Sequence, residues 1–126
     1  MPWRETNAQI VYASDSLNSS IDLEDLERIL NRYKIDKRVK IGSFTCASNV
    51  TGVILDTEKI TSLLHKYGFL SFWDYSTAAP HVKIDMNSKD AIFFSGHKHL
   101  GGPQTPVMCI FLNKQKKIAK KLLKTI

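Results

Sequence analysis

Short apolar runs and helix-spaced apolar positions alternate along this chain. A short run of apolar, β-prone residues is typical of a strand, whereas apolar residues three and four apart indicate an amphipathic helix. The predicted strands are residues 9–13, 39–46, 69–73, 91–94 and 107–112. Helical spacing follows the first, the second and the last of these strands.

Capping residues delimit the first two predicted helices. Asp22 can cap a helix with its carboxylate. The apolar positions of that helix share one face: Leu23, Leu26, Ile29, Leu30 and Tyr33. Asp56 or Thr57 can cap the second helix, and Gly68 is its expected C-terminal stop. The apolar positions of the second helix are Ile60, Leu63, Leu64 and Tyr67.

The order of these elements predicts an α/β fold. Strands that alternate with helices at this spacing favour a mostly parallel sheet with helices on both faces. A chain of 126 residues with 43% apolar and 24% charged residues is one globular domain at most. Right-handed crossovers would place the C-terminal ends of the strands along one edge, where open α/β sheets bind ligands.

The net charge of +6 lies in residues 113–126, which hold six lysines and no acidic residue. The rest of the chain has 12 basic and 12 acidic residues and is balanced. The last segment predicts an amphipathic helix with a solvated lysine face. Binding to nucleic acid or to a membrane surface is the alternative, but the segment has no arginine or aromatic residue to support it. We therefore expect neither nucleic acid nor membrane as a partner.

No apolar run is long enough to span a bilayer, and the first residues lack an apolar signal region. We therefore expect a cytoplasmic protein. Cys46 and Cys109 lie in apolar stretches without metal-ligand spacing. We therefore expect both cysteines to be buried free thiols, and we predict no metal site.

Polar residues follow the predicted strands where ligands would bind: Asn49, Asp74, Ser95, His97 and Lys98. The sheet would bring these residues to one rim although the sequence spreads them over about fifty positions. Each residue also has a purely structural reading. Asp74 or Asn49 could cap a turn, and His97 could be an ordinary loop histidine.

Lys98 stands where a core strand meets a glycine-rich loop. A partly buried ammonium there would lose hydration, which lowers the pKa of lysine. The neutral amine would then be available for Schiff-base chemistry near neutral pH. The alternative reading is a solvated surface lysine.

Three motifs occur in a characteristic order: residues 48–52 (Ser-Asn-Val-Thr-Gly), residues 72–75 (Phe-Trp-Asp-Tyr), and residues 93–106, an apolar strand followed by Ser-x-His-Lys and a Gly-rich loop. Together they resemble class V aminotransferases, the group that includes cysteine desulfurases and selenocysteine lyases. The resemblance covers residues 1–112. It implies the large domain of a fold type I enzyme with pyridoxal 5'-phosphate as cofactor. Residues 1–126 would be the central portion of that domain, without the N- and C-terminal parts of the family chain.

The resemblance also implies a role for each motif residue. Lys98 would be the catalytic Schiff-base lysine, and Asp74 would pair with the pyridine nitrogen. Ser95 and His97 would bind the cofactor phosphate, and Asn49 would contact the phenolic oxygen of the ring. Two threonines complete the cofactor-binding candidates implied by the resemblance: Thr77 and Thr105.

The chain departs from the family pattern at several positions. Desulfurases usually carry Gln or His where this chain has Thr77, which weakens a desulfurase assignment more than a general class V one. Val107 stands where the family usually has glycine, and a β-branched residue does not easily adopt positive φ. Neither cysteine aligns with the catalytic cysteine of desulfurases.

The resulting expectation is a PLP-dependent transferase or lyase that acts on an amino acid, and a homodimer as in the family. This chain alone should bind the cofactor weakly and turn over little, because the elements that stack on the ring are missing. The alternative is a non-catalytic remnant or interaction module of the same fold. A nucleic-acid binder acting through the lysine-rich segment is less favoured.

Overall fold

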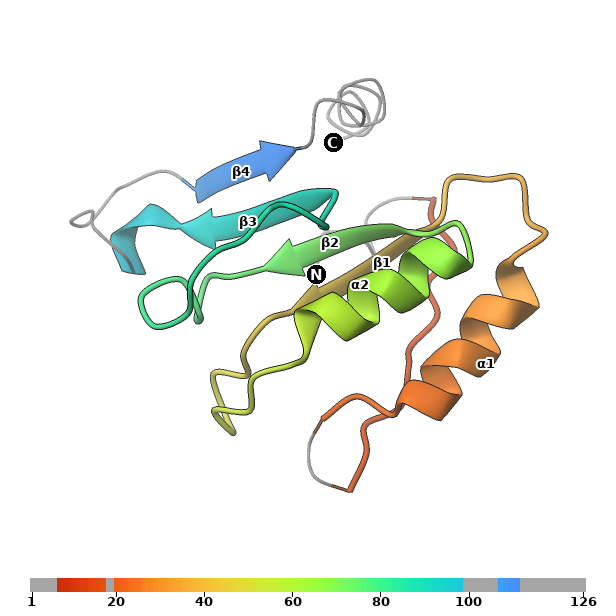
Figure 1. The fold of residues 1–126 in the computed structure, drawn as a ribbon, viewed down its shortest axis with the longest axis horizontal. Coiled ribbons are helices and arrows are strands. Elements are labelled where there is room, and N and C mark those ends of the chain that lie inside the picture. The colour runs from red at the N-terminus through yellow and green to blue at the C-terminus, as the bar shows by residue number, and fades with distance from the viewer. Residues whose placement is uncertain (1–6, 18–19, 99–106, 112–126) are drawn as a thin grey trace.

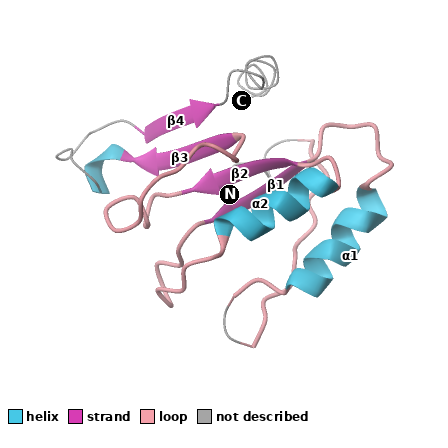
Figure 2. Cartoon of the chain, viewed as in Figure 1, coloured by secondary structure: helices cyan, strands magenta, loops and turns pink. Residues whose placement is uncertain are grey.

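A computed structural model of the chain describes residues 7–17, 20–98 and 107–111. Along the chain, the described helices and strands are α1 (Leu23–Tyr33), β1 (Ile41–Thr45), α2 (Thr57–Lys66), β2 (Leu70–Asp74), β3 (Ala91–Ser95), the 3-10 turn η2 (Gly96–Lys98) and β4 (Val107–Phe111) (Figures 1 and 2). Each of the strands β1 to β4 lies within or one residue beyond a predicted run. The predicted lysine-rich helix and Thr105 lie outside the described residues.

The four strands form one sheet in the order β1-β2-β3-β4. The first three strands are parallel, and β4 is antiparallel to β3. Helix α2 packs on β2, and α1 packs on α2 (Figure 1). The mostly parallel α/β class predicted from the sequence is therefore confirmed.

The helix boundaries follow from local capping. The Asp22 carboxylate accepts hydrogen bonds from the backbone N–H groups of Glu24 and Asp25, at 2.9 and 3.1 Å, and so caps α1. At α2 the cap is Asp56, whose carboxylate accepts from the Lys59 N–H at 3.0 Å. Gly68 has a φ of 74°, the left-handed conformation that ends a helix. These side chains supply partners for backbone groups that a helix end leaves unpaired.

The core lies between the two helices and the face of the sheet that carries Trp73. Trp73 and Leu64 are fully buried, and Leu30 of α1 joins the same cluster. The indole N–H of Trp73 donates to the Thr61 hydroxyl on α2 at 2.9 Å. Gly42 in β1 lets α2 approach closely, because a Cβ atom there would overlap the methyl groups of Leu64.

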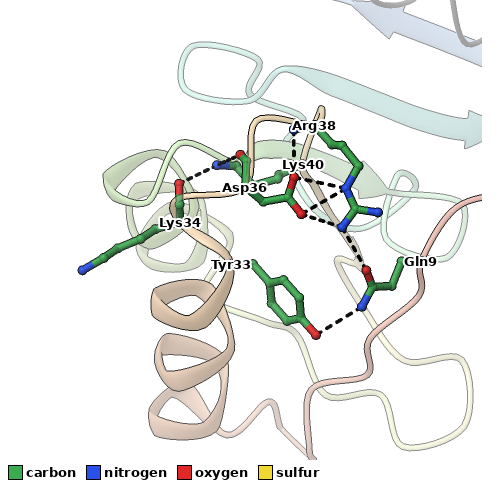
Figure 3. Close-up of polar contacts among 6 residues, drawn as sticks. All are labelled: Gln9, Tyr33, Lys34, Asp36, Arg38 and Lys40. Atoms are coloured by element: carbon green, nitrogen blue, oxygen red, sulfur yellow. Dashed lines mark hydrogen bonds and ion pairs between the residues drawn. The ribbon is translucent and has the colours of Figure 1, made fainter.

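Residues 9–13, predicted as a strand, form no strand in the described structure. The prediction is wrong because a β-prone composition reports only a local preference, whereas a strand also needs a hydrogen-bonded neighbour. The segment is instead fastened to α1 and its flanks. The Gln9 amide bonds Tyr33 and Arg38 (Figure 3), and Ser14 bonds Asp25 and Asp22.

The two cysteines differ in their exposure to solvent. Cys46 is buried and free, as expected. Cys109 is also free but exposed, because it lies on β4, the outer strand of the described sheet. Within the described residues, no helix combines the length and the apolar content needed to cross a membrane.

We expect the Thr61→Val substitution to lower the free energy of unfolding by about 1–3 kcal/mol, because it leaves the buried indole N–H of Trp73 without an acceptor. Valine keeps the shape of threonine, so the loss reports the hydrogen bond. Urea unfolding followed by tryptophan fluorescence measures the change. The control is Ser62→Ala at the neighbouring exposed position of α2, which should stay within about 0.5 kcal/mol. Equal stabilities of the two variants would contradict this account.

Candidate functional site

The C-terminal ends of β1, β2 and β3 meet at one edge of the sheet, because the three strands are parallel and in register. Thr45 pairs with Asp74, and Asp74 pairs with Phe93. The Asp74 carbonyl accepts from the Cys46 N–H at 2.8 Å, and the Tyr75 N–H donates to the Phe93 carbonyl at 2.7 Å. The backbone around Asp74 is thus held from both sides.

The side chain of Asp74 is exposed at this edge. Its Oδ1 atom accepts from the Ser76 N–H at 2.7 Å, which closes a turn directly after β2. The turn-capping role considered for Asp74 is therefore real, but the carboxylate remains accessible to solvent. Thr77 lies half-buried in the same turn region.

The motif lysine lies on the neighbouring strand end. Ser95 is the last residue of β3, and η2 carries His97 and Lys98 immediately after it. The Ser95 hydroxyl donates to the Ser76 hydroxyl at 3.3 Å, which joins the turn after β2 to the end of β3. His97 and Lys98 are exposed. The partial burial considered for Lys98 is thus wrong for this chain, in which Gly96 is the buried residue of the 3-10 turn.

Asn49 lies exposed in the turn that follows β1. The Ser48 hydroxyl accepts the backbone N–H groups of Val50 and Thr51 at 3.2 and 3.1 Å, and Gly52 closes the turn with a φ of 72°. Ser48 therefore holds this turn, rather than Asn49 as the structural alternative had it. The ends of three parallel strands lie along one rim, with Asp74 at the end of β2 and Lys98 in η2, the turn that follows the neighbouring strand β3.

A cleft of about 710 Å³ lies elsewhere. It runs beside β1 and includes Ser48 and Thr51 in its lining, but none of Asp74, Ser95 and Lys98. Among the described residues there is also no cluster of three or more His, Cys, Asp or Glu side chains that could hold a metal ion. The candidate site is thus an open rim of the sheet.

Behind this rim, Tyr75 and Cys46 lie buried next to each other. Burial raises the pKa of Tyr75 to about 12, and contacts with Thr57 and Cys46 modify that effect. Burial likewise raises the pKa of the Cys46 thiol, although a hydrogen bond from Tyr75 opposes the shift. A buried thiol with a raised pKa is a poor nucleophile, so Cys46 is a core residue.

Sequence reasoning missed a buried polar network at the opposite edge of the sheet. Asp90 is 6% exposed, and its Oδ2 atom accepts from the Ser71 N–H at 2.8 Å and the Ser71 hydroxyl at 3.1 Å. The same oxygen lies 2.7 Å from His65 Nε2 on α2. Asp90 therefore locks the start of β3 to β2 and to α2. The sequence signal that could have revealed this network is the position of Asp90, an acidic residue directly before the apolar run of residues 91–94.

Lys89 is the second missed residue, and it is 1% exposed. Its ammonium forms an ion pair with Glu58 of α2, and Ser88 donates to the same carboxylate at 2.5 Å. The hydrogen bond from Lys89 lowers the pKa of Glu58. Glu58 and His65 lie two helical turns apart on one face of α2. Their contacts with Lys89 and Asp90 hold the chain against α2 just before β3.

The arrangement defines an α/β protein whose polar side chains gather at the C-terminal edge of parallel strands, the usual ligand edge of such sheets. The model of the family described as aminotransferase class-V matches residues 1–122. The chain therefore belongs to the class V aminotransferase family.

Two curated relatives illustrate the similarity. The probable cysteine desulfurase of Halalkalibacterium halodurans is 32% identical over 107 residues, which cover 80% of this chain and 25% of that protein. The probable cysteine desulfurase of Borreliella burgdorferi is 30% identical over 124 residues, which cover 94% of this chain and 28% of that protein. The chain thus spans about a quarter of the length of the curated relatives it matches.

Solved structures of similar proteins share the fold of this chain. A NifS-like protein from Rickettsia africae superposes with a TM-score of 0.69 at 27% identity, over 79% of this chain and 27% of that one. The apo structure of a cysteine desulfurase from Thermococcus onnurineus gives a TM-score of 0.71 at 21% identity, over 92% of this chain and 29% of that one. The second similarity establishes the fold alone.

We expect the free energy of unfolding to fall as the pH rises from about 10 to about 12. Deprotonation of Tyr75 should account for part of this fall. Because its folded-state pKa is raised above the ordinary 10.0, its contribution is complete below pH 10 and is lost as the pH approaches about 12. The urea midpoint measured across this interval should fall less in Tyr75→Phe than in the unmodified chain. Tyr12→Phe, at an exposed position, is the control and should follow the unmodified chain. Identical pH profiles for both variants would refute the role of Tyr75.

We expect Asp90→Ala to cost about 2–3 kcal/mol of unfolding free energy, because it leaves the buried N–H and hydroxyl of Ser71 without their acceptor. Chemical denaturation measures the loss. Asp85→Ala removes a carboxylate that accepts only the local Asn87 N–H at 2.8 Å among the bonds described, and should cost less than about 1 kcal/mol. If both variants lose the same stability, Asp90 has no special structural role.

Proposed function

We propose that residues 1–126 are the central part of the large domain of a PLP-dependent transferase or lyase that acts on an amino acid. The observation that carries the proposal is the position of Asp74 and Lys98. The first is an exposed carboxylate at the end of β2, and the second is an exposed amine in η2, the turn that follows the neighbouring parallel strand β3. Membership of the class V family supports the cofactor. The names of the curated relatives favour a desulfurase-like reaction, whereas Thr77 departs from the desulfurase pattern.

The residues at the rim fit pyridoxal phosphate in their chemistry. The cofactor needs an anionic partner for its pyridine nitrogen, an amine for its aldehyde and hydrogen-bond donors for its phosphate. Asp74 offers the carboxylate, Lys98 the amine, and Ser95 and His97 the donors. When bound, the cofactor supplies an electron sink for negative charge that develops on the amino acid.

Each side chain has one proposed task. Asp74, whose Oδ1 is oriented by the Ser76 N–H, favours the protonated pyridine nitrogen by its negative charge. Lys98 holds the cofactor through Nζ and carries a proton to and from the substrate. Ser95 and His97 bind the phosphate. Asn49 contacts the phenolic oxygen, and Thr77 and Thr105 complete the binding set.

The parallel ladder supports the joint action of these residues, because it fixes the separation of the two strand ends. The Ser76–Ser95 hydrogen bond at 3.3 Å couples the loop of the carboxylate to the strand of the amine. A homodimer, as the family resemblance implies, is part of the proposal. The alternative is a module of the same fold without catalysis, and the experiment below separates the two.

We expect PLP added to the chain to attach to Lys98. Borohydride reduction followed by peptide mapping should place the label on the peptide that contains Lys98, and a visible absorption band should appear that Lys98→Ala removes. Asp74→Asn should weaken PLP binding about tenfold or more, which corresponds to about 1.4 kcal/mol.

Lys83→Ala is the matched control, because Lys83 is an exposed lysine outside the rim. It should leave the band and the labelled peptide unchanged. Label spread evenly over surface lysines, with no effect of Lys98→Ala on a folded sample, would favour the non-catalytic module.

A further inference from the structure

One residue of the rim, Ser76, contacts two residues to which cofactor roles were proposed above. Its backbone N–H donates to Asp74 Oδ1 at 2.7 Å, and its hydroxyl lies 3.3 Å from the Ser95 hydroxyl at the end of β3. Asp74 was proposed for the pyridine nitrogen of the cofactor and Ser95 for its phosphate. Ser76 therefore lies between the two ends of the proposed site, and its side chain has no role assigned so far.

The backbone of Ser76 is held in place on both sides. Directly before it, the Tyr75 N–H donates to the Phe93 carbonyl at 2.7 Å, which attaches the turn to β3. After it, the Ala79 N–H donates back to the Tyr75 carbonyl at 2.7 Å, and the side chains of Tyr75, Ala78 and Ala79 are buried. A side chain on a backbone fixed in this way keeps its direction, which is the requirement for orienting a neighbouring group.

The hydrogen bond between the two hydroxyls limits what Ser95 can bind. A serine hydroxyl has one proton to donate and two lone pairs that accept. In the structure the Ser95 hydroxyl donates to the Ser76 hydroxyl, so the Ser95 proton is already in use. A phosphate presents acceptor oxygens, so a hydroxyl that binds it has to donate. Ser95 can therefore bind a phosphate only when it no longer donates to Ser76.

Reversal of this hydrogen bond satisfies both serines. The O–H group of a serine rotates about its C–O bond, so either hydroxyl can be the donor. When Ser76 donates to Ser95, the Ser95 oxygen accepts through a lone pair and its own proton is available for the phosphate. Hydrogen bonds in such a chain polarise one another, so a hydroxyl that accepts a bond becomes a stronger donor. Both serines are half-buried, which limits the access of water to the pair.

We propose that Ser76 is a positioning residue for phosphate binding: its hydroxyl donates to Ser95 and thereby directs the Ser95 proton to the phosphate of the cofactor. The proposal rests on the proposed function, because it needs a phosphate at Ser95. Ser76 acts through Ser95 and does not contact the phosphate itself. Its side chain serves the phosphate end alone, because Asp74 is held by the backbone N–H, which every residue except proline provides.

Two ligands separate the two ends of the site. Pyridoxal has the same ring and aldehyde as PLP but lacks the phosphate. Asp74→Asn changes the pyridine end and should weaken the binding of both ligands. Ser76→Ala removes the hydroxyl and keeps the N–H, so it should weaken the binding of PLP and leave that of pyridoxal unchanged.

Labelling of the chain with each ligand measures this difference. Borohydride reduction over a range of ligand concentrations, followed by quantitative peptide mapping, gives the half-saturating concentration at the Lys98 peptide. The ratio of this concentration for pyridoxal to that for PLP measures recognition of the phosphate. The same ratio at the exposed Lys83 corrects for the different reactivity of the two aldehydes, and the ratio at Lys98 should exceed it. Ser76→Ala should lower the Lys98 ratio about threefold to tenfold.

A conservative variant tests whether the hydroxyl itself is responsible. Ser76→Thr keeps the hydroxyl and should retain the ratio of the unmodified chain, and urea unfolding shows that both variants are folded. Equal weakening of PLP and pyridoxal by Ser76→Ala would mean that Ser76 only holds the turn, and would overturn the proposal. An equal fall of the ratio in Ser76→Thr and Ser76→Ala would overturn it as well.

A double-mutant cycle tests whether Ser76 acts through Ser95. Ser95→Ala should lower the Lys98 ratio, and Ser76→Ala added to it should lower the ratio no further. Additive losses would mean that Ser76 binds the phosphate directly, and an unchanged ratio in Ser95→Ala would mean that Ser95 does not bind it. Either result overturns the proposal.

The same data separate this inference from the proposed function. If neither ligand labels Lys98 in the unmodified chain, the proposed function fails and the inference fails with it. If both ligands label Lys98 but the ratio there equals the ratio at Lys83, the role of Lys98 stands and the role of Ser76 is refuted.

Discussion

The parallel hydrogen-bond ladder of β1, β2 and β3 is the constraint on which the site depends. It holds the backbone at Asp74 between Cys46 and Phe93, with bonds of 2.8 and 2.7 Å on either side. Because the strands run in one direction, residues distant in sequence arrive at the same rim. A slip of one residue in β2 would turn the Asp74 side chain to the opposite face and bury polar groups in the core.

The features predicted well from sequence are those with local causes. Asp22, Asp56 and Gly68 act through backbone groups within a few residues, so the helix ends could be read from the chain itself. The rim was predictable for a related reason. Once the strands are assigned as parallel, the order of the chain alone places the residues after each strand at one edge. The family motifs added the proposed cofactor roles of Lys98 and Asp74, which stay predictions.

The features that sequence reasoning missed depend on partners far away in the chain. Whether residues 9–13 form a strand is decided by the presence of a neighbouring edge, which composition does not report. The burial of Lys89 and Asp90 depends on Glu58 and on His65 and Ser71, and charged residues are rarely buried without such partners. Exposure of Lys98 is likewise set by how the 3-10 turn leaves the core.

The connection between β2 and β3, residues 75–90, contains no helix. A crossover between parallel strands usually covers the sheet with a helix, which brings its own internal hydrogen bonds. Here Tyr75, Ala78 and Ala79 are buried in the core, and Lys89 and Asp90 are anchored to Glu58 and His65 of α2. The stretch between them, which includes the exposed residues His81 and Lys83, is the least secured part of the connection. Local opening of the native state should therefore begin in this connection, and a protease would find its first cleavage site there before the sheet itself comes apart.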